Sequence, residues 1–152
     1  MEKIDWSKRV MDFFLEICRI PRPSGREEKM GEYLLEFAAS RGLAAKKDDV
    51  GNVLISKPAS PGYESRQTVI LQAHQDMVCE KDATLNHDFM TQPIETYVED
   101  GWLKARGTTL GADDGMGIAM ALAILDSPEI EHGPVECLFT VSEETGLTGA
   151  EN

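Results

Sequence analysis

Residues 68–73 read Thr-Val-Ile-Leu-Gln-Ala, a continuous run dominated by apolar side chains. Such a run is typical of a central strand that is covered on both faces of a sheet, because a strand with one wet face alternates apolar and polar residues. Residues 135–141, Val-Glu-Cys-Leu-Phe-Thr-Val, predict a second central strand, and residues 52–56 predict a shorter one. The centre of the fold is therefore expected to be a sheet.

Helical patterns surround these strands. Asp5 can cap a first helix with one apolar face, and the capping-box pattern Ser-Gly-Arg-Glu at residues 24–27 predicts the start of a second. Residues 116–125 are apolar nearly all round and predict a buried third helix. Short strands at 95–98 and 102–105, joined through Asp-Gly, predict a hairpin. The alternation of helices and strands indicates a layered α/β fold.

Composition limits the class of function. The chain has 152 residues, the size of one domain, with 15 Lys and Arg against 27 Asp and Glu, for a net charge of −12. This charge repels phosphate backbones and anionic membranes, and the longest apolar stretch is far short of a membrane span. The three cysteines, Cys18, Cys79 and Cys137, show no CxxC spacing and are expected to be free thiols in a reducing cytoplasm.

His74 and Asp76 directly follow the first predicted central strand. Positions two apart on an extended backbone point the same way, so the two side chains can lie side by side. A neutral imidazole could then bind a metal while the carboxylate accepts its other N–H. On this pair alone, an ordinary surface His and Asp at a strand end remains an alternative.

Asp113 and Asp114 lie in a glycine-bracketed turn before the third helix. Acids in such a turn commonly cap the helix, and Asp114 is the candidate for that role. A phosphate-binding loop is disfavoured because no Gly-Lys-Ser/Thr follows and two aspartates repel phosphate. A carboxylate can also bridge two cations through its two oxygens, so either aspartate is a candidate bridging ligand.

Glu143 and Glu144 follow the second predicted central strand. One of them could bind a metal while the other holds a proton, although a solvated acidic strand end is the alternative. Taken together, the three clusters are expected to meet at one edge of the sheet. Histidine with carboxylates is a ligand set for zinc, and a pair of metal ions suits amide hydrolysis because it activates a water and polarises a carbonyl.

A His-x-Asp pair, a glycine-bracketed Asp and a Glu-Glu pair, in this order, resemble the core of the co-catalytic zinc peptidases. This family includes aminoacylases, carboxypeptidase G-type enzymes and dipeptidases, and the resemblance to its dipeptidase branch covers essentially the whole chain. The stretches that carry it are residues 20–25 (IPRPSG), 71–81 (LQAHQDMVCEK), 87–89 (HDF), 102–117 (WLKARGTTLGADDGMG) and 139–150 (FTVSEETGLTGA).

The resemblance implies a role for each acidic or imidazole residue. His74 is implied as a ligand of one metal, Asp113 as the ligand that bridges both, and Glu144 as a ligand of the other. Asp76 is implied to orient His74, and Glu143 to act as the general base that passes a proton from water to the leaving amine.

Two finer expectations concern position 114. The resemblance implies a cis peptide bond between Asp113 and Asp114. Most of the wider family carries Lys at position 114, whereas the dipeptidase branch carries an acid or an amide, so Asp114 favours that branch.

The implied fold is a layered αβα catalytic domain with a mixed, mainly parallel sheet. Residues 1–152 would be its N-terminal part, without the lid domain and the remainder of the catalytic domain. Two further metal ligands would then come from outside the chain, so the chain alone is expected to be inactive and to have an exposed sheet edge.

The implied function is metal-dependent hydrolysis of dipeptides, those ending in histidine included, with two divalent ions. Zinc is the first candidate, and manganese or cobalt would also suit the ligands. The expected partner is the dipeptide substrate, with no nucleic acid or membrane, in the cytoplasm; a homodimer is left open. The alternatives are an aminoacylase, a tripeptide aminopeptidase, a non-catalytic cation-binding module, or acidic clusters that only aid solubility.

Overall fold

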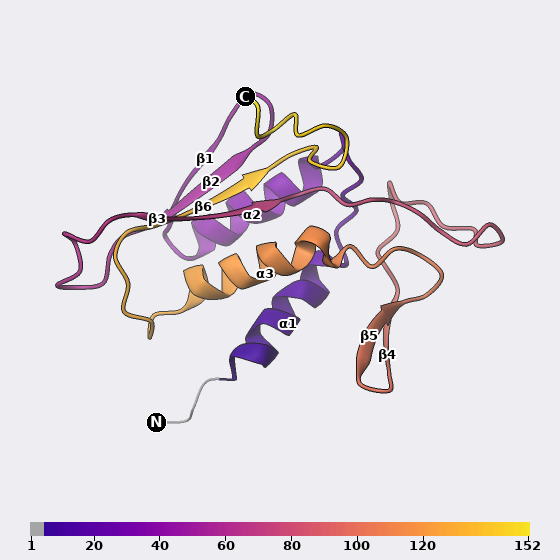
Figure 1. Cartoon of the computed structure of the whole chain (residues 1–152), viewed down its shortest axis with the longest axis horizontal. Coiled ribbons are helices and arrows are strands. Elements are labelled where there is room, and N and C mark those ends of the chain that lie inside the picture. The colour runs from indigo at the N-terminus through magenta and orange to yellow at the C-terminus, as the bar shows by residue number, and fades with distance from the viewer. Residues whose placement is uncertain (1–4) are drawn as a thin grey trace.

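The computed structural model describes residues 5–152, which form a mixed sheet with helices packed on it and a hairpin that projects beside them (Figure 1). The elements in chain order are α1 (Trp6–Ile17), α2 (Glu28–Ser40), β1 (Ala44–Lys47), β2 (Val53–Lys57), β3 (Val69–His74), β4 (Thr96–Glu99), β5 (Trp102–Ala105), α3 (Ala112–Asp126) and β6 (Val135–Thr140). The expected helices and strands are all present, with boundaries shifted by a few residues.

The main sheet has the strand order β1-β2-β6-β3. It is mixed, as predicted, but only β3 and β6 run parallel, so a mainly parallel sheet is not found among these four strands. The difference arises because β2 runs antiparallel to both β1 and β6. Strand β1 was not predicted from the sequence, because Ala-Ala-Lys-Lys lacks the β-branched and aromatic residues that favour strands. A tight turn joins β1 to β2, and this connection requires an antiparallel pair.

One face of the sheet is buried and the other is more open. Val53 of β2 lies opposite Phe139 of β6, and both are fully buried. The next pair in register, Leu54 opposite Leu138, points to the other face and is only partly buried. The alternation shows that the core lies on one side of the sheet.

The helices lie on the side of this buried face: α2 packs on β1 and β2, α3 packs on β3, and α1 packs against α3. Phe13 of α1 packs edge-on against Phe37 of α2 with ring centroids 5.7 Å apart, and Arg41 after α2 pairs with Asp126 at the end of α3 at 2.6 Å. The second helical layer of the expected αβα arrangement is not among residues 5–152. No helix in this part of the chain is long and apolar enough to cross a membrane.

Strand β3 differs from its prediction as a central strand. It lies at the edge of the sheet, where Val69 and Ile70 are 53% and 62% exposed, while Ala73 and His74 at its other end are buried. Within the described residues β3 pairs only with β6, and α3 packs against it. The continuous apolar run is therefore covered only in part, and the exposed sheet edge that was expected is present.

Two of the three predicted N-terminal helix caps are present in the structure. Asp5 Oδ1 accepts a hydrogen bond from Lys8 N at 3.1 Å, as expected. Asp114 Oδ1 accepts one from Gly117 N at 3.1 Å, and regular helical backbone in α3 begins only after Asp114. Asp114 therefore caps the regular part of α3, as predicted.

The predicted capping box at residues 24–27 is wrong. Helix α2 begins at Glu28, and its N-cap residue Glu27 makes no side-chain cap. The Ser24 hydroxyl donates to Asp76 Oδ2 instead, and Glu27 Oε1 accepts from Gly25 N. The side chains of Ser24 and Glu27 therefore form hydrogen bonds with groups that lie outside α2.

Hairpin β4–β5 confirms the Asp-Gly prediction. Asp100 and Gly101 have φ values of 51° and 80°, the left-handed conformation that a two-residue hairpin turn requires. The neighbouring Val98 and Trp102 are each 71% exposed, in keeping with a hairpin that projects from the sheet (Figure 1).

The packing of α3 gives a test of this fold. Leu122 is fully buried in α3, so Leu122→Ala is expected to lower the free energy of unfolding by about 2–5 kcal/mol. Met120 lies on the same helix and is 50% exposed. Met120→Ala should therefore change the free energy of unfolding by less than about 1 kcal/mol. Urea denaturation of both variants measures the difference, and equal losses would contradict the described face of α3.

Candidate metal centre

The predicted metal-ligating and catalytic residues lie together where β3 and β6 end and α3 begins. His74 is the last residue of β3, Asp113 is the second residue of α3, and Glu143 and Glu144 follow β6 within four residues. Because β3 and β6 are parallel neighbours, their carboxyl ends meet at one edge of the sheet. The fold thus brings together side chains that are up to 70 positions apart in the sequence.

The polar atoms of this cluster are close together. His74 Nε2 lies 3.0 Å from Asp113 Oδ1 and 3.9 Å from Glu143 Oε2. Potential ligand atoms of His74, Asp113 and Glu144 all lie within 4.8 Å of one another. The imidazole is buried, whereas the Asp113 side chain is 85% exposed, so the cluster opens toward solvent.

Asp76 lies beneath the cluster and is completely buried. Its Oδ1 lies 3.2 Å from His74 Nδ1 and accepts from Glu143 N at 3.0 Å. Its Oδ2 accepts from Ser24 Oγ at 2.6 Å and from Glu144 N at 3.2 Å. Burial alone would raise the pKa of Asp76, but these hydrogen bonds hold it well below the usual range, so the carboxylate stays ionised.

The charge of His74 depends on the two carboxylates that flank it. Burial alone would lower the pKa of His74, but the hydrogen bonds to Asp76 and Asp113 outweigh it and raise the pKa to about 9. Without a cation the imidazole is therefore protonated at neutral pH and donates from both ring nitrogens. Deprotonation at Nε2 would leave that nitrogen free as a ligand while Nδ1–H still donates to Asp76.

The cluster carries excess negative charge. Partial burial raises the pKa of Glu144, and the charges of Asp113 and Glu143 raise it further. Within residues 5–152, no lysine or arginine forms an ion pair with any of these three acids. Closely spaced carboxylates beside an imidazole suit a divalent cation, so the donor set fits the expected metal ions.

The two aspartates of the turn separate in the structure. The Asp113–Asp114 peptide bond is cis, as expected. Asp113 faces His74, whereas the Asp114 carboxylate is turned to backbone donors, accepting from Gly117 N at 3.1 Å and from His74 N at 3.3 Å. Asp113 is therefore the aspartate of this turn that lies in the cluster.

Arg22 supports the site, although no sequence pattern predicted a role for it. It is 2% exposed, and its Nη1 donates to the carbonyl oxygens of Gln75 and Asp76 at 3.0 and 2.8 Å. Its Nη2 donates to Gly111 O. A Cβ atom at position 111 would lie 2.6 Å from Nη2, so the close approach of Arg22 requires glycine there. Arg22 thereby links the end of β3 to the start of α3. The sequence signal was only its place in residues 20–25, which carry the family resemblance.

The chain is similar to known peptidases. Residues 70–152 match the sequence profile of peptidase family M20/M25/M40. The chain is 50% identical over 139 residues to the cytosol non-specific dipeptidase of Escherichia coli, which covers 91% of this chain and 29% of that protein. It also matches the crystal structure of aminoacylhistidine dipeptidase from Vibrio alginolyticus, with a TM-score of 0.92 and 46% identity over 98% of this chain and 31% of that one.

A more distant solved structure shares the fold. It is a Bacillus subtilis protein described as a dinuclear metal-binding peptidase of the M20 family, with a TM-score of 0.54 and 13% identity over 91% of this chain and 36% of that one. The chain spans 29% and 31% of the lengths of the two dipeptidases that it matches.

The pKa of His74 predicts how stability depends on pH in the absence of metal. The folded-state pKa of about 9 lies above the usual histidine value of 6.5, so the folded chain holds a proton that the unfolded chain releases. This contribution is complete below about pH 6.5 and is lost as the pH rises through 9. Urea denaturation in EDTA should show a loss of about 2–3 kcal/mol over this range.

His74→Asn is the variant that checks this dependence, because it cannot carry the charge. It should lack the loss, whereas His132→Asn should keep it, since His132 lies in the loop before β6 and takes no part in the His74 contacts with Asp76 and Asp113. Parallel stability profiles for the wild type and His74→Asn would show that His74 does not carry this proton.

Proposed function

Because the chain belongs to the metallopeptidase family M20/M25/M40, we propose that it carries metal-binding and catalytic residues of a dipeptidase. The observation that supports this most directly is the cluster of His74, Asp113 and Glu144, with Glu143 beside it, in a chain similar to two dipeptidases. The proposed reaction is hydrolysis of dipeptides, including those that end in histidine.

In this proposal three residues hold two divalent cations. His74 would hold one, Glu144 would hold the other, and Asp113 would be shared by both. Zinc is the first candidate, and manganese and cobalt accept the same donors. When bound, such a pair of cations supplies an activated water and polarises the substrate carbonyl.

The proton is moved by Glu143 in the proposed mechanism. Its carboxylate accepts a proton from the attacking water and delivers it to the leaving amine, so the peptide bond is replaced by a carboxylic acid and an amine. The Glu143 side chain is 37% exposed and lies 3.9 Å from His74 Nε2, within reach of both the cluster and a substrate. Asp76 is a positioning residue, since it holds His74 by Nδ1.

The setting of the protein belongs to the same proposal. Residues 1–152 would form the N-terminal part of the catalytic domain, as the sequence resemblance implies. The cysteines are free, two of them buried, and the dipeptidase from E. coli is named as cytosolic, which supports a reducing cytoplasm. The proposed partner is the dipeptide substrate. A homodimer is left open, and the oligomeric state in solution would have to be measured.

Metal binding tests the ligand set directly. The 152-residue chain, dialysed against zinc and then against buffer, should retain zinc by elemental analysis, and His74→Ala should weaken zinc affinity at least tenfold. His132→Ala is the matched control, since His132 lies outside the cluster. Equal zinc in the wild type and His74→Ala would remove His74 from the ligand set.

Turnover tests the role of Glu143 and separates an enzyme from a non-catalytic cation-binding module. We would replace the aligned segment of the E. coli dipeptidase with this chain and measure dipeptide hydrolysis by the chimera. Glu143→Gln should retain zinc and lower kcat by at least about 10²-fold, because the amide cannot accept the proton. Unchanged kcat in this variant would contradict the proposed base.

A further inference from the structure

The turn after β6 is held by two carboxylates through three successive backbone N–H groups. Ser142 N donates to Glu27 Oε1 at 2.9 Å. The next two N–H groups, of Glu143 and Glu144, donate to the two oxygens of Asp76 at 3.0 and 3.2 Å. Asp76 also contacts His74 and belongs to the candidate centre, whereas Glu27 forms no hydrogen bond or ion pair with the side chains of the cluster among the described residues.

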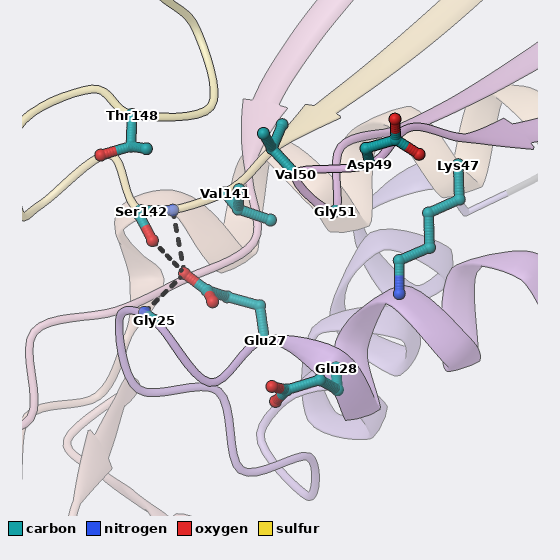
Figure 2. A pocket seen from close by; sticks show the side chains of 10 residues that line it. All are labelled: Gly25, Glu27, Glu28, Lys47, Asp49, Val50, Gly51, Val141, Ser142 and Thr148. Atoms are coloured by element: carbon teal, nitrogen blue, oxygen red, sulfur yellow. Dashed lines mark hydrogen bonds between the residues drawn. The ribbon is translucent and has the colours of Figure 1, made fainter. Parts of the chain in front are cut away.

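Glu27 joins the start of α2 to this turn. Its side chain is nearly buried, with the residue 7% exposed, and one oxygen, Oε1, accepts all three of its hydrogen bonds. The donors are Gly25 N at 2.9 Å, Ser142 N at 2.9 Å and Ser142 Oγ at 3.0 Å, as the dashed lines in Figure 2 show. A single carboxylate oxygen therefore fixes both the backbone and the side chain of Ser142.

The backbone of Ser142 requires such support. Its φ is 52°, in the left-handed region that is unfavourable for a residue with a Cβ atom. This conformation turns the chain out of β6 and sets the directions in which Glu143 and Glu144 leave the backbone. Two hydrogen bonds to a buried acceptor compensate locally for the unfavourable conformation.

A polar pocket lies next to this contact. Glu27 and Ser142 line it together with Glu28, Lys47 and Asp49, which Figure 2 shows around the opening. On the pocket side, Ser142 donates its backbone N–H and its hydroxyl to Glu27. Without the Glu27 carboxylate these donors would face water in the pocket, which does not fix their direction.

We infer that Glu27 is a positioning residue that acts through Ser142 to direct Glu143 and Glu144 into the candidate metal centre. This role rests on the proposed function of those two acids. The contact itself is independent of that function and is testable without metal or substrate.

Amide hydrogen exchange in EDTA tests the contact in the 152-residue chain. Glu27→Ala should accelerate exchange of residues 142–144 at least tenfold, with α1 and α3 unchanged. Glu27→Gln should remain within threefold of wild type, because the amide retains the one oxygen that accepts all three bonds. Ser142→Ala, which removes only the hydroxyl bond, should accelerate exchange less than Glu27→Ala and serves if that variant does not fold.

Asp88→Ala provides a matched control. Like Glu27, Asp88 accepts hydrogen bonds from backbone and hydroxyl donors, in its case Met90 N and Thr91 Oγ1 in the loop before β4. Its replacement should accelerate exchange only in that loop. Unchanged exchange of residues 142–144 in both Glu27→Ala and Ser142→Ala, or a uniform acceleration along the chain, would overturn the inference.

Activity of the chimera provides the second measurement. Glu27→Ala should lower kcat at least tenfold with KM within threefold, and Glu27→Gln should restore kcat. Full kcat in Glu27→Ala, or no rescue by Glu27→Gln, would overturn the positioning role. A wild-type chimera without dipeptidase activity would count against the proposed function, and the exchange measurement would still decide whether Glu27 holds the turn.

Discussion

The buried carboxylate of Asp76 is the group on which the arrangement of the candidate site depends. An ionised carboxylate without solvent is costly unless donors replace the water, and Asp76 takes its donors from separate parts of the chain. Ser24 approaches from the segment before α2, His74 from the end of β3, and Glu143 and Glu144 from the turn after β6. The cost of burial is therefore offset only when these segments are correctly assembled.

The same requirement explains why the support is spread so widely. The guanidinium of Arg22 places a buried positive charge near Asp76 and donates to the carbonyl oxygens of Gln75, Asp76 and Gly111. It replaces the solvent that these groups lose, and it joins the segments that carry His74 and Asp113. The start of the chain up to α2 thus contributes charge and hydrogen bonds to the site, although no candidate ligand comes from it.

Sequence patterns predicted those features that depend on neighbouring residues. The two-residue periodicity of a strand placed His74 beside Asp76, and the structure has their atoms 3.2 Å apart. The turn at residues 113–114 was also predicted, but spacing alone left its two aspartates equivalent. They differ because the Asp114 carboxylate is used by Gly117 N and His74 N, contacts that depend on the three-dimensional arrangement.

Long-range contacts account for the main errors. Ser24 and Glu27 fit a capping box, but their partners are Asp76, 52 positions away from Ser24, and Ser142, 115 positions away from Glu27. A local capping interaction stabilises the fold by about 1 kcal/mol. Hydrogen bonds that pair a buried carboxylate, or that hold a residue in the left-handed conformation, can stabilise it by more. The same limit applies to β3, since an apolar run shows that a strand favours burial but not which element covers it.

A proton on His74 balances part of the negative charge of the candidate site. Protonated His74 lies between Asp76 and Asp113 and neutralises part of a cluster that would otherwise be purely acidic. A cation at Nε2 would have to displace the proton that Asp113 now accepts, while the Nδ1–H contact with Asp76 is unaffected. The buried half of the network is then common to both states, and only the exposed half, where Asp113 and Glu143 reach solvent, has to change. The fold therefore brings His74, Asp113 and Glu143 together through contacts between the chain's own residues.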